Sequence, residues 1–108
     1  MSRHIAAAPE TIWDLLTDIA RIPSWYDDWD VAQRDDAAMR LHSGATFGLI
    51  RHRLGAEQAT VCNVITFVRP TLLTWIERTA DQAPVKVEFH LALSNAGGTT
   101  LTMRKRWM

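Results

Sequence analysis

Side chains able to do chemistry are few in this sequence, and the densest group lies in one short segment. Residues 23–30 read PSWYDDWD and contain three aromatic and three acidic side chains. Such a segment fits a metal site, a platform for stacking bases, or a joint that locks two parts of a fold together. The other polar candidates lie singly on predicted strands: Arg51, His52, Asn63, Glu77 and His90.

The acidic residues do not complete a metal-binding motif. Asp28 and Asp30 are two residues apart, but a calcium loop needs further oxygen ligands and a glycine at fixed offsets. His42 and His52 do not have the i, i+4 spacing of a zinc-binding pair on a helix. Cys62 is the only cysteine, which excludes a zinc site built on paired cysteines. We therefore predict no metal and no cofactor.

The charge of the chain argues against nucleic acid as a partner. Twelve basic side chains balance twelve acidic ones, whereas nucleic-acid-binding domains usually carry a basic excess. The acidic residues among Trp25, Tyr26 and Trp29 would repel the phosphates of any base stacked there. The basic cluster at 104–106 is short and typical of a solvated strand end.

Length and composition indicate one soluble domain over residues 1–108, because 47% of the residues are hydrophobic and 22% are charged. A single cysteine cannot form an internal disulfide, which fits a cytoplasmic location. The N-terminus lacks the apolar run of a signal peptide. No stretch approaches the ~18 apolar residues of a membrane span, so no membrane insertion is expected.

The elements that must position these side chains begin with an edge strand in residues 2–7 and two short helices. Pro9 suits the first position of a helix. An amphipathic stripe at i, i+3, i+4 and i+7 is formed by Ile12, Leu15, Leu16 and Ile19. Asp18 is predicted to cap the second helix with its side chain. The sequence therefore predicts helices over 9–17 and about 19–26.

The rest of the chain is predicted to form strands. Their expected ranges are 31–40, 45–54, 57–68, 72–79, 85–94 and 99–108. Residues 85–94 give the clearest signal, because apolar and polar side chains alternate along them. Consecutive strands with short loops form an antiparallel meander. The predicted fold class is α+β, with two helices packed on a curved sheet of about six to seven strands.

The run IAAAPETIWDLLTDIARIPSWY resembles the opening of the START-like, or helix-grip, superfamily of SRPBCC type. This superfamily includes polyketide cyclases, aromatases and lipid-transfer domains. Its recurrent positions correspond here to Ala8-Pro9, Trp13, Asp18, Pro23 and Trp25. The segments GATFGL, RPTLLTWIER, VEFHLAL and GGTTLTMR resemble its successive strands. The resemblance covers nearly the whole chain and implies a helix-grip fold.

The sequence departs from the family pattern at its end. Family members close with a long C-terminal helix held by the sheet, whereas this sequence stops at the last predicted strand. We therefore expect a C-terminally truncated START-like domain whose C-terminal helix is absent. An apolar face that includes Val87, Phe89, Leu91 and Met103 would then be exposed and would drive association. We predict a homodimer that covers this open face.

The resemblance also implies a cavity between sheet and helices for a hydrophobic small molecule, either a lipid or a polyketide-like compound. The predicted lining residues are Trp25, Tyr26, Phe47, Leu49, Ile65, Phe67, Leu73, Trp75, Phe89, Leu91 and Met103. Apolar alternation is also what any half-buried strand shows, so the alternative is that these side chains simply fill a core.

The polar strand residues leave the chemistry open. His90 is out of phase with its apolar neighbours and should face solvent. Arg51 and His52 lie on opposite faces of one strand, and an inward histidine could act as a general base. No catalytic motif transfers, so no residue is assigned as catalytic. We prefer a binder or carrier of a hydrophobic molecule; the alternatives are a polyketide cyclase, aromatase or dehydratase, and an oligomerising or partner-binding subunit without a ligand.

PSWYDDWD itself is interpreted as the hinge of a helical lid. Trp25 is expected to anchor the lid, and Trp29 to reach the same apolar face if the helix runs another turn. Tyr26 would line the mouth of the cavity, where its hydroxyl needs a polar partner. The three aspartates would form the wet side.

Overall fold

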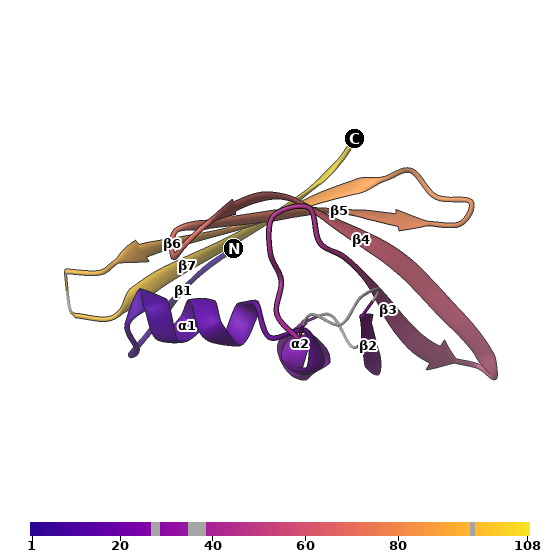
Figure 1. Ribbon diagram of the computed structural model, residues 1–108, viewed down its shortest axis with the longest axis horizontal. Helices are drawn as coiled ribbons and strands as arrows, with labels where there is room; N and C mark the ends of the chain where they lie inside the picture. Colours follow the sequence, from indigo (N-terminus) through magenta and orange to yellow (C-terminus); the bar gives the residue numbers. More distant parts are fainter. Residues whose placement is uncertain (27–28, 35–38, 96) are drawn as a thin grey trace.

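One curved antiparallel sheet arches over a layer of short helices, which lies against its concave side (Figure 1). The computed structural model describes residues 1–26, 29–34, 39–95 and 97–108. The helical segments are α1 (Pro9–Leu16), the 3-10 helix η1 (Ile19–Arg21) and α2 (Ile22–Trp25). The strands are β1 (Ser2–Ile5), β2 (Val31–Arg34), β3 (Thr46–Arg53), β4 (Ala56–Val68), β5 (Leu72–Thr79), β6 (Val85–Leu93) and β7 (Thr99–Trp107). The predicted α+β helix-grip architecture is confirmed.

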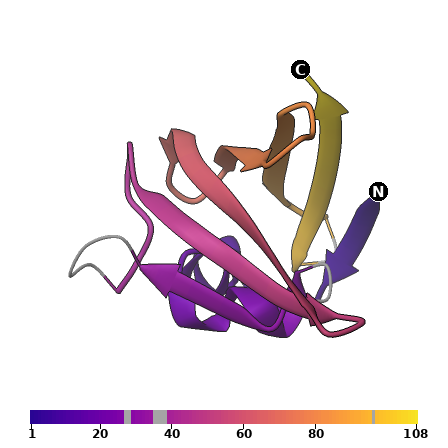
Figure 2. The ribbon, with the colours of Figure 1, turned by 90° about the vertical axis from the view of Figure 1, so that its right-hand side faces the viewer.

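The strands follow chain order across the sheet except for β1, which lies at the far edge beside β7. β1 pairs antiparallel with β7 from Ser2 opposite Thr102 to Ile5 opposite Thr99. Figure 2 shows the N-terminal strand running alongside the C-terminal one. The predicted edge strand and meander are thus correct, and the first residues border the last strand.

Helix α1 starts at Pro9, as predicted, and most of the expected apolar stripe is buried. Ile12, Leu16 and Ile19 are buried, whereas Leu15 is 38% exposed. Trp13 is buried as well, and its indole packs edge-on against Phe67 with 5.1 Å between ring centroids. The buried face of the helix therefore includes Trp13 and leaves out Leu15.

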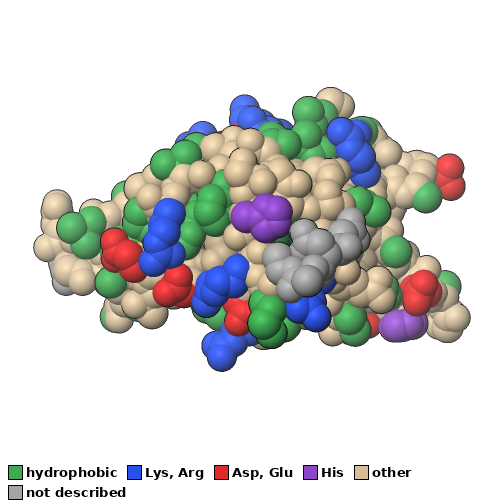
Figure 3. All heavy atoms as spheres, viewed as in Figure 1, with side chains coloured by type: hydrophobic (Ala, Val, Ile, Leu, Met, Phe, Trp, Pro, Cys, Tyr) green, Lys and Arg blue, Asp and Glu red, His purple; other side chains and the backbone are tan. Residues whose placement is uncertain are grey.

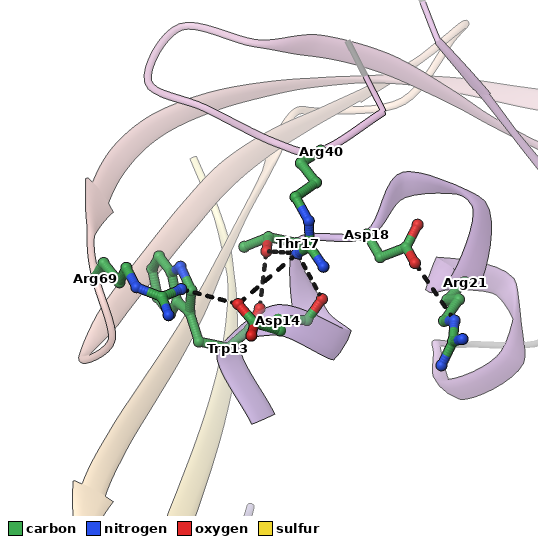
Figure 4. Close-up of polar contacts among 7 residues, drawn as sticks. All are labelled: Trp13, Asp14, Thr17, Asp18, Arg21, Arg40 and Arg69. Atoms are coloured by element: carbon green, nitrogen blue, oxygen red, sulfur yellow. Dashed lines mark hydrogen bonds and ion pairs between the residues drawn. The ribbon is translucent and has the colours of Figure 1, made fainter. Parts of the chain in front are cut away.

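The second predicted helix is two shorter pieces, η1 and α2, joined without a gap. Asp18 lies at the N-cap position of η1, but its side chain makes no capping hydrogen bond. Its carboxylate instead pairs with Arg21 at 3.3 Å (Figure 4). The prediction that Asp18 caps this helix was therefore wrong, because the nearby guanidinium competes for the carboxylate.

A polar network ties α1 to two loops (Figure 4). Arg69, in the turn between β4 and β5, donates from Nη1 to Asp14 Oδ1 at 2.9 Å. Arg40 Nη1 donates to the carbonyl of Asp14 at 2.9 Å and to Thr17 Oγ1 at 3.2 Å. Two guanidinium groups thus converge on α1 and fix it against the sheet and against the segment that leads to β3.

The face that was expected to stay open is largely covered. Val87, Phe89 and Leu91 are buried, and Met103 is partly buried against the core. The expectation that all four are exposed was wrong, because the helices and the aromatic side chains reach across β6. Trp107, at the end of β7, remains 71% exposed.

β7 is the last element of the structure, and no helix follows it within residues 97–108. Among the described residues, no helix is both long enough and apolar enough to cross a membrane.

Candidate functional site

Most of the residues predicted to line a cavity pack against one another in the core. Trp75 is at their centre, with ring centroids 4.9 Å from Phe89, 5.2 Å from Phe47 and 5.4 Å from Tyr26. The buried members of the predicted set are Tyr26, Phe47, Leu49, Leu73, Trp75, Phe89 and Leu91; Trp25, Phe67 and Met103 are partly buried against them. The middle of the concave face is therefore filled by side chains in this structure.

Ile65 is the exception, because its side chain is 46% exposed rather than turned inward. The register between β4 and β5 shifts between Val64 and Thr66, so that Val64 and Phe67 both pair with core residues of β5. A β-bulge inserts one extra residue and inverts the alternation beyond it. The assignment of Ile65 to the cavity was wrong for this reason.

The strand β3 turns Arg51 inward and His52 outward. Arg51 shares a face with the buried Phe47 and Leu49, and its guanidinium carbon lies 4.5 Å from the ring centroid of Trp29. The side chain of His52 is largely exposed, 3.6 Å from carboxylate oxygens of both Asp30 and Glu57. The idea of an inward histidine acting as a general base is therefore not supported.

His90 faces away from the helices, as predicted, and belongs to a charged cluster on the convex side of β6. Its Nε2 lies 3.1 Å from Glu88 Oε2, and Arg106 donates to the other carboxylate oxygen. Lys86 Nζ is 3.7 Å from the same carboxylate. These hydrogen bonds, that of His90 first, lower the pKa of Glu88 to about 2.

The polar centre on the concave face is Glu77. It lies two residues after Trp75 on β5 and therefore faces the same side. Trp75 Nε1 donates to Glu77 Oε2 at 3.0 Å, and the hydroxyl of Tyr26 donates to the same oxygen. The polar partner expected for Tyr26 is thus a carboxylate held at the edge of the aromatic core.

Lys105 adds a cation on the same side of the sheet. It follows Leu101 and Met103 in alternation along β7, and its Nζ lies 4.8 Å from the ring centroid of Tyr26. Burial lowers the pKa of Lys105. The interruption of an apolar strand face by Glu77 and by Lys105 is a signal that the sequence carries, but only the register of the sheet shows that both approach Tyr26.

An open pocket of about 360 Å³ adjoins these groups. Its walls include Trp29, Arg51, Gln58, Glu77, Val85 and Lys105. Trp29 is buried here although α2 ends at Trp25, so it reaches the concave face from the chain beyond the helix. A second hollow of about 260 Å³ shares Glu77, Val85 and Lys105 with the first.

Burial sets the protonation of the groups around Glu77. It raises the pKa of the Tyr26 hydroxyl, an effect strengthened by the negative charge of Glu77, so the phenol stays protonated and donates. It also raises the pKa of the Cys62 thiol, which lies opposite Glu77 on β4. The site therefore offers the Glu77 carboxylate with two fixed donors, together with Lys105 and Arg51 as cations and Glu57 as a second carboxylate in the pocket wall.

The described residues contain no group of three or more His, Cys, Asp or Glu side chains placed to hold a metal ion. Asp30 accepts a hydrogen bond from the backbone N–H of His52 at 2.8 Å. Asp27 and Asp28 of the acidic segment lie outside the described residues. The arrangement on the concave face instead suits recognition of an organic molecule.

Residues 6–106 match the model of the family described as activator of Hsp90 ATPase homolog 1-like protein. The chain belongs to this family. The match includes every element that forms the polar centre and the pocket, from Tyr26 to Lys105. The helix-grip resemblance drawn from the sequence is thereby confirmed.

Solved structures show the same fold. A protein from Rhodobacter sphaeroides is 25% identical, with a TM-score of 0.75, over 99% of this chain and 70% of its own. CalU16 from Micromonospora echinospora is 20% identical, with a TM-score of 0.67, over 96% of this chain and 55% of its own. DynU16, from the dynemicin biosynthetic locus, is 18% identical, with a TM-score of 0.72, over 99% of this chain.

This member of the family spans 36% of the length of DynU16. No curated protein matches its sequence. The structural similarities therefore establish its fold. Its function is inferred from the residues of the concave face.

Proposed function

We propose that this chain binds a small, largely hydrophobic molecule in the open pocket beside the aromatic core, with the polar part of the ligand at Glu77. The observation that carries the proposal is the position of Glu77. Its carboxylate lies between the aromatic core and an open pocket of about 360 Å³.

The composition of the site supports this role. Small-molecule sites combine apolar and aromatic walls with a few fixed polar groups, and their volumes begin at roughly 300 Å³. Here Trp29 and Val85 supply apolar wall beside the aromatic core, while polar residues form the larger part of the pocket wall, with Glu77, Lys105 and Arg51 among its charged groups. Lipids and polyketide-like molecules fit such a combination, because both join an extended apolar body to oxygen-containing groups.

Fluorescence titration tests the proposal with 1-ethylnaphthalene as a hydrophobic probe. We expect saturable binding of one molecule per chain. Val85→Trp fills the pocket and should abolish binding, whereas Leu93→Trp, at a strongly exposed position on the same strand, should not. Equal binding by both variants would contradict the proposal. If the probe binds as expected, native mass spectrometry of the protein purified from its source would identify the ligand that it retains.

A second candidate is an enzyme of the polyketide cyclase, aromatase or dehydratase type. It is favoured by the convergence of Glu77, Lys105 and Arg51 on one pocket. In this case Glu77 would accept a proton from a carbon next to a ketone, and the two cations would stabilise the enolate oxygen. Exchange of the methyl protons of 1-acetonaphthone in D₂O, followed by NMR, should be accelerated by the protein and not by Glu77→Gln.

The oligomerising role predicted from the sequence stays a third proposal. The exposed side chains Trp107 and Met108 support it, since they prolong the apolar side of the sheet beyond the covered part of β6. Sedimentation at micromolar concentration would refute the homodimer if it showed a well-behaved monomer. The single-domain extent over residues 1–108 and the cytoplasmic location also stay predictions.

A further inference from the structure

The indole N–H of Trp25 has no hydrogen-bond acceptor. Its Nε1 is sealed from solvent, and no described residue accepts from it. Buried polar groups are almost always paired, because an unpaired donor loses its water without replacement. The indole N–H groups of tryptophans buried in this way usually find a partner, as Trp75 does at Glu77.

The unpaired donor lies next to the proposed ligand site, on the other side of the aromatic cluster from the pocket at Glu77. The ring of Trp25 contacts Tyr26 and Phe89, each with 5.5 Å between centroids, and lies 6.5 Å from Trp75. Tyr26 and Trp75 are also the two donors to Glu77. Trp25 thus covers the aromatic cluster whose polar edge is Glu77.

Trp25 lies on a short turn that borders open space. Its side chain is only partly buried, and α2 is a single turn of four residues. An open hollow of about 510 Å³ is lined by Pro23 and Ser24 of the same turn and by Trp29. A ligand could stack on Phe89 only by displacing the indole of Trp25.

We infer that Trp25 selects ligands carrying a neutral carbonyl oxygen, which accepts the hydrogen bond that its N–H lacks in the free protein. This inference rests on the proposed binding function and narrows it to aromatic or polycyclic molecules with a ketone, ester or amide group. The aromatic part would stack on Phe89 and Tyr26, in the space that the indole vacates. The carbonyl satisfies the donor, whereas a hydrocarbon of the same shape leaves it unpaired.

A matched pair of probes tests the inference. 1-Acetonaphthone and 1-ethylnaphthalene have the same skeleton and differ by a carbonyl in place of a methylene group. Trp25→Phe keeps an aromatic ring and removes the N–H. We expect this change to weaken the binding of the ketone about tenfold more than that of the hydrocarbon, as for the loss of one hydrogen bond. Trp13→Phe is the control and should change neither affinity, because the Trp13 indole packs against Phe67 and lines neither of the two hollows at Glu77.

NMR of the unaltered protein provides a second measurement that does not depend on the folding of a variant. The chain has five tryptophans, and the indole signal of Trp25 is assigned by its loss in Trp25→Phe. The ketone should move this proton downfield, whereas the hydrocarbon should not, and the signal of Trp13, which lies against Phe67, should stay in place with both probes.

The outcomes separate this inference from the proposed function. If Trp25→Phe weakens both probes equally and the Trp25 proton does not move downfield with the ketone, Trp25 is only an apolar wall. The inference then fails while hydrophobic binding stands. If neither probe binds the unaltered protein, both the inference and the proposed function fail.

Discussion

Glu77 concentrates the polar chemistry of the concave face in one side chain. Its Oε2 accepts hydrogen bonds from both Tyr26 and Trp75, and its neighbour across the strand pair is Cys62. The shared acceptor keeps the phenol and the indole directed at the boundary between core and pocket. In the proposed function, the remaining lone pairs of the carboxylate would meet the ligand.

The single tyrosine of the chain makes the state of this cluster measurable. Burial and the charge of Glu77 raise the pKa of Tyr26, so its neutral form is favoured in the folded protein. We expect no tyrosinate absorbance as pH rises through about 10, the range of an exposed tyrosine, until the protein unfolds. The expected sign is a loss of stability above that pH, since the unfolded chain releases the proton more easily.

A spectrophotometric titration at 295 nm checks this prediction, with the same protein in denaturant as the reference. A normal titration curve for the folded protein, centred near pH 10, would show that the Tyr26 hydroxyl is not enclosed as described.

Glu88 predicts the opposite pH dependence on the other face of the sheet. Its pKa is lowered to about 2, first by the hydrogen bond from His90 and then by that from Arg106. The folded state therefore favours the carboxylate, and this stabilisation is present above the ordinary pKa of 4.5 and is lost as pH falls toward 2.

Denaturation in urea across pH 6 to 2 should show this loss. Glu88→Gln should flatten the slope below about pH 4.5. Glu57→Gln, whose carboxylate is exposed, is the control. An unchanged slope in Glu88→Gln would count against the charged cluster.

At the scale of elements, the two N-terminal helices differ in how firmly they are packed against the sheet. α1 buries Trp13 almost completely against Phe67, and the guanidinium groups of Arg40 and Arg69 hold it in place. α2 holds Trp25 only partly buried and with an unpaired N–H. α1 therefore anchors the helical layer, and α2 is held to the core by a less buried tryptophan.

This division predicts different costs for truncating the two tryptophans. Trp13→Ala should lower the free energy of unfolding by about 3–5 kcal/mol, as for a fully buried large side chain. Trp25→Ala should cost less, because its ring is partly exposed and its removal also deletes an unsatisfied donor. Urea denaturation of the two variants decides the order; a larger cost for Trp25→Ala would mean that α2 is the anchor.

The strands show which features of the fold can be predicted from the sequence and which cannot. β5 and β6 occupy 72–79 and 85–93, close to their predicted ranges, because alternation along an antiparallel strand is visible in one chain. The bulge at Ile65 cannot be seen in the sequence of β4, because a strand with inverted alternation has the same mixture of apolar and polar residues as a regular strand. The sequence also could not show which of Arg51 and His52 faces the core, because both faces of β3 carry apolar residues.

The polar centre needed information that no single strand contains. Glu77 and Lys105 come close through the register of β5, β6 and β7, and Tyr26 reaches both of them from the end of α2. Glu77 was among the polar candidates, but its partners were not identifiable from spacing. The aromatic residues were correctly placed on the concave face, whereas their mutual packing depends on exact side-chain volumes.

On the scale of the whole molecule, the sheet is completed by contacts between the two ends of the chain. The N-terminal amine donates to the carbonyl of Met103 at 3.1 Å, and Thr99 Oγ1 donates to the carbonyl of Ala7 at 2.7 Å. β1 therefore covers an edge of β7 that would otherwise present unpaired backbone groups.

Removal of residues 1–5 should expose that edge. We expect the shortened protein to be less stable and to self-associate, because an uncovered strand is a template for pairing with another chain. Light scattering combined with urea denaturation measures both effects. A shortened protein that stayed monomeric with unchanged stability would show that β1 does not protect β7.

The pairing of β1 with β7 also affects the order in which the sheet forms during synthesis. Ser2 and its partner Thr102 are separated by almost the entire sequence, so the ribosome makes the first strand long before its neighbour exists. Until β7 has been made, β3 to β6 can pair with strands that are near in sequence, whereas β1 has no strand partner. Pairing between segments so distant in sequence slows folding, so β1 joins the sheet only after the strand that carries Lys105 has emerged.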